Sequence, residues 1–213
     1  SEKEVVEQSR PCMRVHSREG QLVLGKDRAF TFDYVFGERA QQRDVYEECC
    51  EALVGGCLEG YNGTIMAYGQ TGSGKTHTMG SGGQAGIGST DGIGVIPRAL
   101  RHLFGELHGE GASGAEDADA GTGDGAEDSE EDSVEDGGVG DELEDLERMG
   151  FSLQATYLEI YNEEVKDLLH PQTPAKSISI RETARGDIAV HGARAERVRT
   201  LAQTLRCLEA GNA

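Results

Sequence analysis

A glycine-rich stretch in the first half of the chain has the residue types and the spacing of a phosphate-binding loop. Residues 69–76 read G-Q-T-G-S-G-K-T and fit the pattern G-x-x-x-x-G-K-[ST]. In such loops consecutive backbone N–H groups wrap a diphosphate, and glycine permits close approach of the backbone because it has no Cβ. The predicted nucleotide-binding residues are Gly69, Gln70, Thr71, Gly72, Ser73, Gly74, Lys75 and Thr76.

Two side chains of this loop carry the chemistry that the pattern predicts. The ammonium of Lys75 is placed to reach the β- and γ-phosphates of a nucleoside triphosphate, and the Thr76 hydroxyl is placed to ligate Mg²⁺. Gln70 and Thr71 are expected to contribute backbone N–H groups. Phosphoryl transfer depends mainly on positioning and charge neutralisation. We therefore predict Thr76 as a metal ligand and no catalytic base in this chain.

The loop needs a strand before it and a helix after it. The apolar run 63–68 predicts a buried strand that leads into the loop, and a short helix is expected to begin at Lys75. The glycine-rich residues 81–92 are predicted to form a mobile loop.

Apolar periodicity predicts alternating strands and helices in the rest of the chain. The predicted strands are 21–24, 30–34, 151–161, 177–181 and 187–190, and the predicted helices are 42–58, 93–107 and a last helix that begins after a Thr200 cap. The buried face of helix 42–58 is expected to run through Val45, Cys49, Leu53 and Cys57, with Cys50 and Val54 beside it. This alternation predicts an α/β fold with a central, mostly parallel sheet flanked by helices.

The net charge of −19 describes one segment of the chain and not the whole of it. Residues 110–147 hold 17 acidic residues and no Lys or Arg, and the rest of the chain is close to neutral. The Gly-rich acidic segment 109–147 has too little apolar surface to offset the entropy of ordering, so we predict a disordered insertion. The low pI of 4.6 therefore does not exclude an anionic partner.

Cysteine usage and hydropathy restrict the class of protein. The five cysteines form no C-x-x-C pair, and no His stands at the spacing of a zinc site, so we expect reduced thiols and an intracellular protein. The chain has no long apolar run, and we expect it not to enter a membrane.

Four blocks of sequence, in order, resemble the kinesin motor domain. They begin at Phe30 (F-T-F-D-Y-V-F), at Ala67 (A-Y-G-Q-T-G-S-G-K-T-H-T-M-G), at Gly92 (G-I-G-V-I-P-R) and at Tyr157 (Y-L-E-I-Y-N-E-E-V-K-D-L-L). The resemblance covers about 12–108 and 150–213, and its wording is most similar to the fourth, chromokinesin-like class.

The resemblance implies a P-loop NTPase fold, ATP and Mg²⁺ as cofactors, and a microtubule-stimulated ATPase that moves along microtubules. It implies that His77 lies against the adenine ring, and that Lys176, Arg181 and Arg185 are candidate contacts to tubulin. It also implies a protein of the cytoplasm and cytoskeleton, with no nucleic-acid or membrane partner, that dimerises through a coiled coil outside this chain.

The family's R-x-R-P strand and its N-x-x-S-S-R-S-H and D-L-A-G-S-E loops do not occur in these 213 residues. We interpret residues 9–11 (S-R-P) as linker and expect an incomplete motor: 1–108 with the P-loop, the insertion 109–147, and 148–213, which stops before the nucleotide-sensing loops. Such a fragment is not expected to turn over ATP alone. A motor-derived regulatory protein that does not hydrolyse nucleotide remains an alternative, whereas a GTPase is disfavoured because N-K-x-D is absent.

Overall fold

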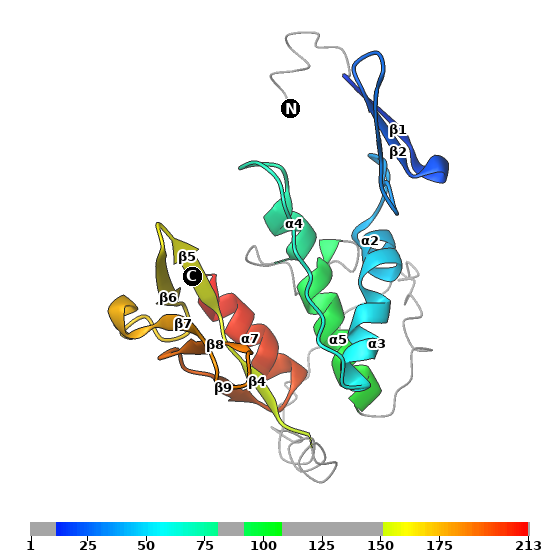
Figure 1. The fold of residues 1–213 in the computed structure, drawn as a ribbon. Coiled ribbons are helices and arrows are strands. Elements are labelled where there is room, and N and C mark those ends of the chain that lie inside the picture. The colour runs from blue at the N-terminus through cyan, green and yellow to red at the C-terminus, as the bar shows by residue number, and fades with distance from the viewer. Residues whose placement is uncertain (1–11, 81–91, 108–150, 213) are drawn as a thin grey trace, which may run out of the picture. The chain divides into compact units, whose positions relative to one another are not determined.

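The computed structural model describes residues 12–80, 92–107 and 151–212 (Figure 1). Its chain divides into two compact units, 1–80 with 89–95, and 81–88 with 96–213. The mobile loop predicted at 81–92 falls almost wholly outside the described residues. The acidic insertion predicted at 109–147 lies outside them entirely.

The first unit begins with a three-stranded antiparallel sheet. Its strands are β1 (Met13–His16), β2 (Gln21–Leu24) and β3 (Arg28–Thr31), with β2 in the middle and the 3₁₀ turn η1 (Ser17–Glu19) between β1 and β2. Strand β2 confirms the predicted strand, and β3 begins and ends earlier than the predicted 30–34. The sequence analysis missed β1, whose four residues (M-R-V-H) alternate apolar and polar but form a very short segment that is exposed throughout.

The helix predicted over 42–58 is interrupted once. Helix α2 (Gln42–Cys49) and helix α3 (Glu51–Leu58) meet at Cys50, where the backbone has φ −123° and ψ −32°. The Val54 N–H still donates to the Cys50 carbonyl at 3.1 Å, so the break is local.

The buried face of these two helices overlaps the predicted one only in part. The buried side chains are those of Gln42, Tyr46, Cys50 and Val54. Burial is thus confirmed for Cys50 and Val54, whereas Cys49, Leu53 and Cys57 are exposed. The centre of the face lies one residue, about 100° around the helix, from the predicted centre. Apolar content is similar on both faces, but the larger Tyr46 ring and the Gln42 amide find their partners on the observed one.

The segment that leads into the glycine-rich loop is extended but is not paired as a strand. Residues 61–69 run between α3 and α4 (Lys75–Met79) without a strand assignment (Figure 1). Ile65 and Ala67 are partly buried, and Met66 and Tyr68 are 80% and 97% exposed. The strand predicted at 63–68 is therefore corrected: its alternation is present, but it has no hydrogen-bonded neighbour among the described residues.

Close packing of two glycines marks the end of α4. Gly80 is its left-handed C-cap, with φ +74°, and donates its N–H to the Thr76 carbonyl at 2.9 Å. A Cβ on Gly94 would collide with the Gly80 backbone, so a larger residue at 94 would push the two segments apart.

The second unit has its core between two helices and a short strand pair. Helix α5 (Val95–Leu107) buries Phe104 and Leu107, against which Leu103, Leu153 and Leu201 pack. The predicted helix 93–107 is confirmed with a later start, and Pro97 lies in its first turn, where no N–H donor is needed.

The last helix of this unit, α7 (Leu201–Gly211), is capped as predicted. The Thr200 hydroxyl accepts a hydrogen bond from the Gln203 N–H at 3.1 Å, which satisfies a donor that the first turn leaves open. The helix lies along the strand pair that holds β9 (Figure 1).

Three antiparallel strand pairs complete the second unit. Strand β4 (Leu153–Ala155) pairs with β9 (Glu196–Val198), β5 (Leu158–Tyr161) with β6 (Glu164–Asp167), and β7 (Ser179–Glu182) with β8 (Ile188–His191). The predicted hairpin of 177–181 and 187–190 is confirmed. The single strand predicted over 151–161 is instead two strands with different partners, and β9 was missed.

The predicted central, mostly parallel sheet is not found among the described residues. Every strand pairing there is antiparallel, and only β4–β9 joins segments distant in sequence. Hairpins close with short turns, whereas a parallel sheet needs crossover connections and strands from several parts of a polypeptide. The α/β composition is confirmed, and its parallel arrangement is corrected.

Candidate functional site

The predicted phosphate loop forms a tight turn between the extended segment and α4. The Ser73 N–H donates to the Gln70 carbonyl at 3.2 Å, and the Thr78 N–H to the Gly74 carbonyl at 2.9 Å. Gly72 and Gly74 have φ of +78° and +92°, a left-handed conformation that side chains with a Cβ rarely adopt. A Cβ at either position would meet open space, so the turn needs glycine here for its backbone conformation.

Lys75 is folded over this turn. Its ammonium donates to the carbonyls of Gly69 at 2.8 Å and of Gln70 at 2.7 Å, so the side chain reaches back across the loop to its first two residues. An ammonium has three protons, and these two bonds leave one for another acceptor. The positive charge therefore lies beside the loop backbone, and its predicted contact with the β- and γ-phosphates stays a prediction.

The remaining loop residues are open to solvent. Residues 69–74 and Thr76 are exposed and Lys75 is half-buried. In the described part of the chain, the Ser73 N–H is the one donor of 69–76 that bonds to a backbone carbonyl. Its neighbours keep their N–H groups available, which is the arrangement that an incoming phosphate requires.

Thr76 brings an exposed hydroxyl to the first turn of α4. One hydroxyl cannot hold Mg²⁺ without further oxygens, and Mg²⁺ in nucleotide sites is completed by phosphate oxygens and water. The described residues contain no group of three or more His, Cys, Asp or Glu able to hold a metal ion. The donor set thus fits a metal that arrives with a nucleotide.

His77 follows Thr76 and is tied to another helix. The side-chain nitrogen of Gln42, the first residue of α2, donates to the His77 carbonyl at 2.6 Å and lies 2.9 Å from its Nδ1. Gln42 is 7% exposed, whereas the His77 side chain is exposed. Sequence reasoning missed Gln42. The signal in the sequence is the position of Gln42, a polar residue four positions before Tyr46 and therefore on the same buried face of the helix.

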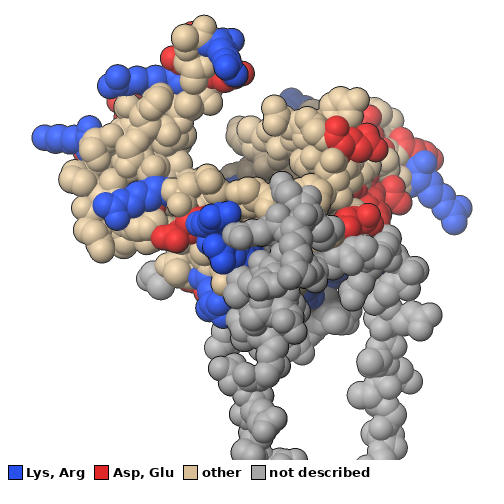
Figure 2. All heavy atoms as spheres, turned by 90° about the horizontal axis from the view of Figure 1, so that it is seen from below, with Lys and Arg blue, Asp and Glu red and all other residues tan. Residues whose placement is uncertain are grey.

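The predicted tubulin contacts lie on and beside one hairpin of the second unit. Lys176 belongs to the 3₁₀ turn η3 (Ala175–Ser177), Arg181 to β7, and Arg185 to the turn between β7 and β8. All three side chains are exposed, and within the described ranges no ion pair involves them. On the face drawn in Figure 2, basic and acidic side chains are interspersed over the described residues.

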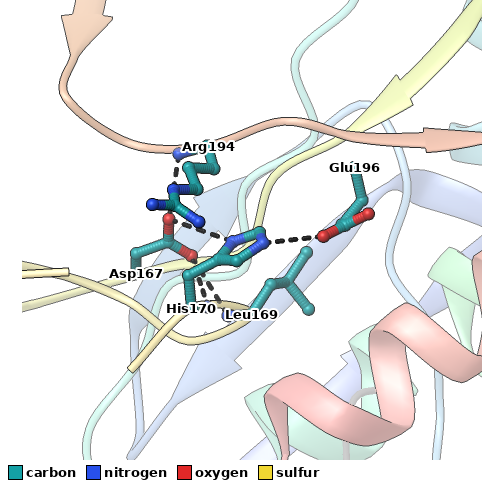
Figure 3. A network of polar contacts seen from close by, with 5 residues as sticks. All are labelled: Asp167, Leu169, His170, Arg194 and Glu196. Carbon is teal, nitrogen blue, oxygen red and sulfur yellow. Dashed lines mark hydrogen bonds and ion pairs between the residues drawn. The ribbon is translucent and has the colours of Figure 1, made fainter. Parts of the chain in front are cut away.

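A second polar cluster lies in the second unit around Asp167 (Figure 3). This carboxylate is 2% exposed and accepts backbone N–H bonds from Leu169 at 3.1 Å, His170 at 3.0 Å and Arg194 at 3.0 Å. The His170 ring lies between two carboxylates, with Nε2 2.7 Å from Glu196 and Nδ1 3.5 Å from Asp167. Nδ1 of His170 thus lies within ion-pair distance of Asp167, but it makes no hydrogen bond within the described residues.

Two opposed effects act on the Asp167 carboxyl. Burial by itself raises the pKa of Asp167, but the N–H groups of Arg194, His170 and Leu169 and the adjacent His170 ring stabilise the anion, and the net pKa is lowered. The three backbone N–H groups of this cluster are thus already bonded to a carboxylate of the chain itself.

Neither the cysteine side chains nor the hydropathy of the helices adds a group to the candidate site among the described residues. All five cysteines are free: Cys50 is buried, Cys207 is intermediate and the other three are exposed. Burial is the largest cause that raises the pKa of Cys49, Cys50 and Cys207, which disfavours the reactive thiolate. No helix within the described ranges has the length and apolar character needed to span a bilayer.

An extended segment, a glycine-rich turn spanned by its own lysine and a short helix define the P-loop class of nucleotide-binding proteins. A family model of the kinesin motor domain matches residues 2–213, and the chain belongs to that family. The match is wider than the resemblance of 12–108 and 150–213. It includes residues 9–11, interpreted above as linker, which lie outside the described residues.

The curated relatives are kinesins. The chain is 34% identical to the human kinesin-like protein KIF27 and 36% identical to human KIF21A, over 99% and 98% of its length. It is 35% identical to the human chromosome-associated kinesin KIF4A over 99% of its length. These identities are nearly equal, so the chromokinesin-like subclass stays a prediction. The chain spans only 12%, 11% and 14% of these relatives' lengths.

A solved structure of a fast kinesin supports the same fold. It superposes with a TM-score of 0.71 at 25% identity, over 98% of this chain and 48% of that one. The kinesin type of P-loop NTPase fold is thereby shown, although the sheets described here are small and antiparallel.

Proposed function

We propose that this chain is the ATP-binding part of a motor protein that couples ATP hydrolysis to movement along microtubules. The observation that carries the proposal is the loop at 69–76, with its left-handed glycines and its lysine bridge, in a chain that belongs to the kinesin motor domain family. The motor-derived regulatory alternative has no observation in its favour.

The contacts of Lys75 suggest how a nucleotide enters. Its two carbonyl acceptors are weaker partners than a phosphate oxygen, because a hydrogen bond between two charged groups is stronger than one to a neutral carbonyl. Phosphate would therefore draw the ammonium away from Gly69 and Gln70 while the loop N–H groups turn to the same anion. Bound Mg²⁺ would neutralise phosphate charge, and the Thr76 hydroxyl would hold it in place.

No residue of the loop is proposed as a base. Within the described ranges the exposed hydroxyls of Thr71, Ser73 and Thr76 contact no acidic or basic side chain, so we assign proton transfer to other groups. We propose that 1–108 and 148–213 belong to one motor domain and that 109–147 is a spacer between them.

Microtubules are the proposed partner, and the cytoplasm and cytoskeleton the proposed location. The exposed cations Lys176, Arg181 and Arg185, on and beside the β7–β8 hairpin, suit the acidic surface of a tubulin filament. Dimerisation through a coiled coil outside this chain is part of the same proposal.

The proposal is tested on the whole protein by ATP turnover with and without microtubules. We expect slow basal turnover that microtubules stimulate. Weak or absent ATP binding, or ATP binding without stimulated turnover, would refute the motor proposal and favour the regulatory alternative.

A further inference from the structure

The Gln42–His77 contact joins the start of one helix to the residue that follows the phosphate loop. Gln42 is the first residue of α2, and the start of that helix is itself held, because the Gln41 N–H donates to the Asp44 carboxylate at 2.9 Å. His77 lies 35 positions further along, in the middle of α4. Both residues belong to the same compact unit. A fixed element therefore holds a residue directly beside the candidate nucleotide site.

The orientation of the Gln42 amide follows from its partners. The group 2.6 Å from the His77 carbonyl must be a donor, since two carbonyl oxygens at that distance would repel each other. The same nitrogen lies 2.9 Å from Nδ1 of the His77 ring. An amide NH₂ has two protons, so it can serve both acceptors.

This assignment decides which protonated form of the ring is compatible. Nδ1 accepts a hydrogen bond only when it carries no proton, so this contact selects the tautomer with its proton on Nε2. The Nδ1 edge is committed to Gln42. In the described part of the chain Nε2 has no partner, and the side chain is exposed.

We propose that Gln42 is a positioning residue for nucleotide binding: it holds the His77 ring through Nδ1 as the Nε2–H tautomer, so that the exposed ring presents one donor edge to a nucleotide bound at 69–76. The inference rests on the proposed function, because it requires a nucleotide whose phosphates lie on 69–76. Gln42 touches the ligand through no atom of its own. Its burial at 7% agrees with a residue that acts through a neighbour.

The tautomer of the His77 ring can be measured directly. A Gln42 side chain that only stabilised the fold would not determine that tautomer. In the ¹⁵N-histidine-labelled 213-residue chain, His77 is assigned by the signal that His77→Gln removes, and its ring ¹⁵N shifts report the tautomer. We expect Nε2–H in the wild type. The isosteric Gln42→Glu replaces a donor with an acceptor and should move His77 to a form protonated on Nδ1. A wild-type ring protonated on Nδ1, or an unchanged ring in a folded Gln42→Glu chain, overturns the inference. If Gln42→Glu does not fold, Gln42→Met decides, because loss of the clamp should leave a mixture of tautomers.

The link to nucleotide is tested with a double-mutant cycle on the whole protein. Gln42→Met should weaken ATP binding about two- to tenfold, the range expected for a hydrogen bond. It should have no further effect in a His77→Ala background. Arg43→Gln, in an exposed pair on the same helix, is the matched control and should change nothing. Additive losses from Gln42→Met and His77→Ala refute the positioning role while ATP binding itself stands. A wild type that binds no ATP refutes the proposed function, and the tautomer measurement still decides the clamp.

Discussion

The loop at 69–76 and the cluster around Asp167 use the same groups for opposite purposes. Asp167 is a buried carboxylate that accepts three backbone N–H bonds, all of them within the chain. The loop is exposed, its glycines hold a left-handed turn, and its lysine rests on two carbonyls. The backbone N–H groups around Asp167 are occupied by a carboxylate of the chain itself, and we call this arrangement the closed nest. The N–H groups of the loop 69–76 are exposed, and we call this arrangement the open nest.

We expect the two sites to contribute differently: the Asp167 cluster to the stability of the fold, and the loop 69–76 to ligand binding. Hydrogen bonds to a charged group contribute about 1.5–3 kcal/mol, so a buried carboxylate with three donors stabilises the second unit strongly. The exposed loop lacks that stabilisation, and we propose that its N–H groups bind phosphate instead. Changes at Asp167 should therefore affect folding, and changes in the loop should affect ligand binding.

The largest effect is expected for Lys75→Ala in the whole protein. The loop loses the cation placed to meet the phosphates, and ATP affinity should fall by about a hundredfold or more. Isothermal titration and turnover measure this loss. Lys26→Ala, which removes an exposed lysine of the same unit, is the control and should leave ATP binding unchanged. Normal hydrolysis by Lys75→Ala would contradict the assignment of the loop.

Asp167→Ala should be the most destabilising change outside the loop. It leaves three buried N–H donors without an acceptor and the His170 ring without one of its carboxylates, at a cost of about 3–5 kcal/mol. Urea unfolding of the 213-residue chain measures the change. Asp187→Ala, at an exposed turn position, is the control. Equal unfolding midpoints for the two variants would show that the closed nest contributes no stability.

Thr76→Ala should weaken nucleotide binding in a way that depends on Mg²⁺. The variant loses one oxygen ligand, whereas Thr76→Ser keeps it. We expect Thr76→Ala to need a higher Mg²⁺ concentration for half-maximal turnover, while Thr76→Ser remains close to the wild type. Comparable losses in EDTA and in excess Mg²⁺ would argue against a metal ligand.

The closed nest should also make stability depend on pH. The pKa of Asp167 is lowered from its ordinary value of 3.8, so the folded state favours the anion. Its contribution is complete above that value and is lost as the pH falls through the lower pKa of the folded protein. The difference in unfolding free energy between wild type and Asp167→Asn should therefore shrink as the pH falls below 3.8. A difference that grows on acidification would reverse the sign assigned here.

Removal of residues 111–141 should have the smallest effect on either nest. The segment lies outside the described residues, and its charge is separate from both sites in sequence. We expect the whole protein without it to keep its fold and ATP turnover, with a small change in microtubule affinity. A large gain in affinity that disappears with added salt would instead indicate that the segment inhibits filament binding.

Local sequence was sufficient for much of the fold and the site. The glycines and Lys75 of the loop, the Thr200 cap and the β7–β8 hairpin each depend on residues a few positions apart, and each was predicted. The single strand over 151–161 failed because apolar alternation does not show that β4 and β5 have different partners. The mostly parallel sheet failed for the same reason, since strand partners are not encoded within a strand.

By itself the sequence predicted the phosphate loop and its lysine, and it identified the family to which the chain belongs. The tertiary structure decided which face of α2 and α3 is buried, that Gln42 reaches His77, and that the Arg194 N–H closes the nest around Asp167 from 27 positions away. The physical reason is the range of the forces. Turn conformations and caps are settled by neighbours along the chain, whereas a buried amide or carboxylate takes whichever partner the fold brings within hydrogen-bond distance.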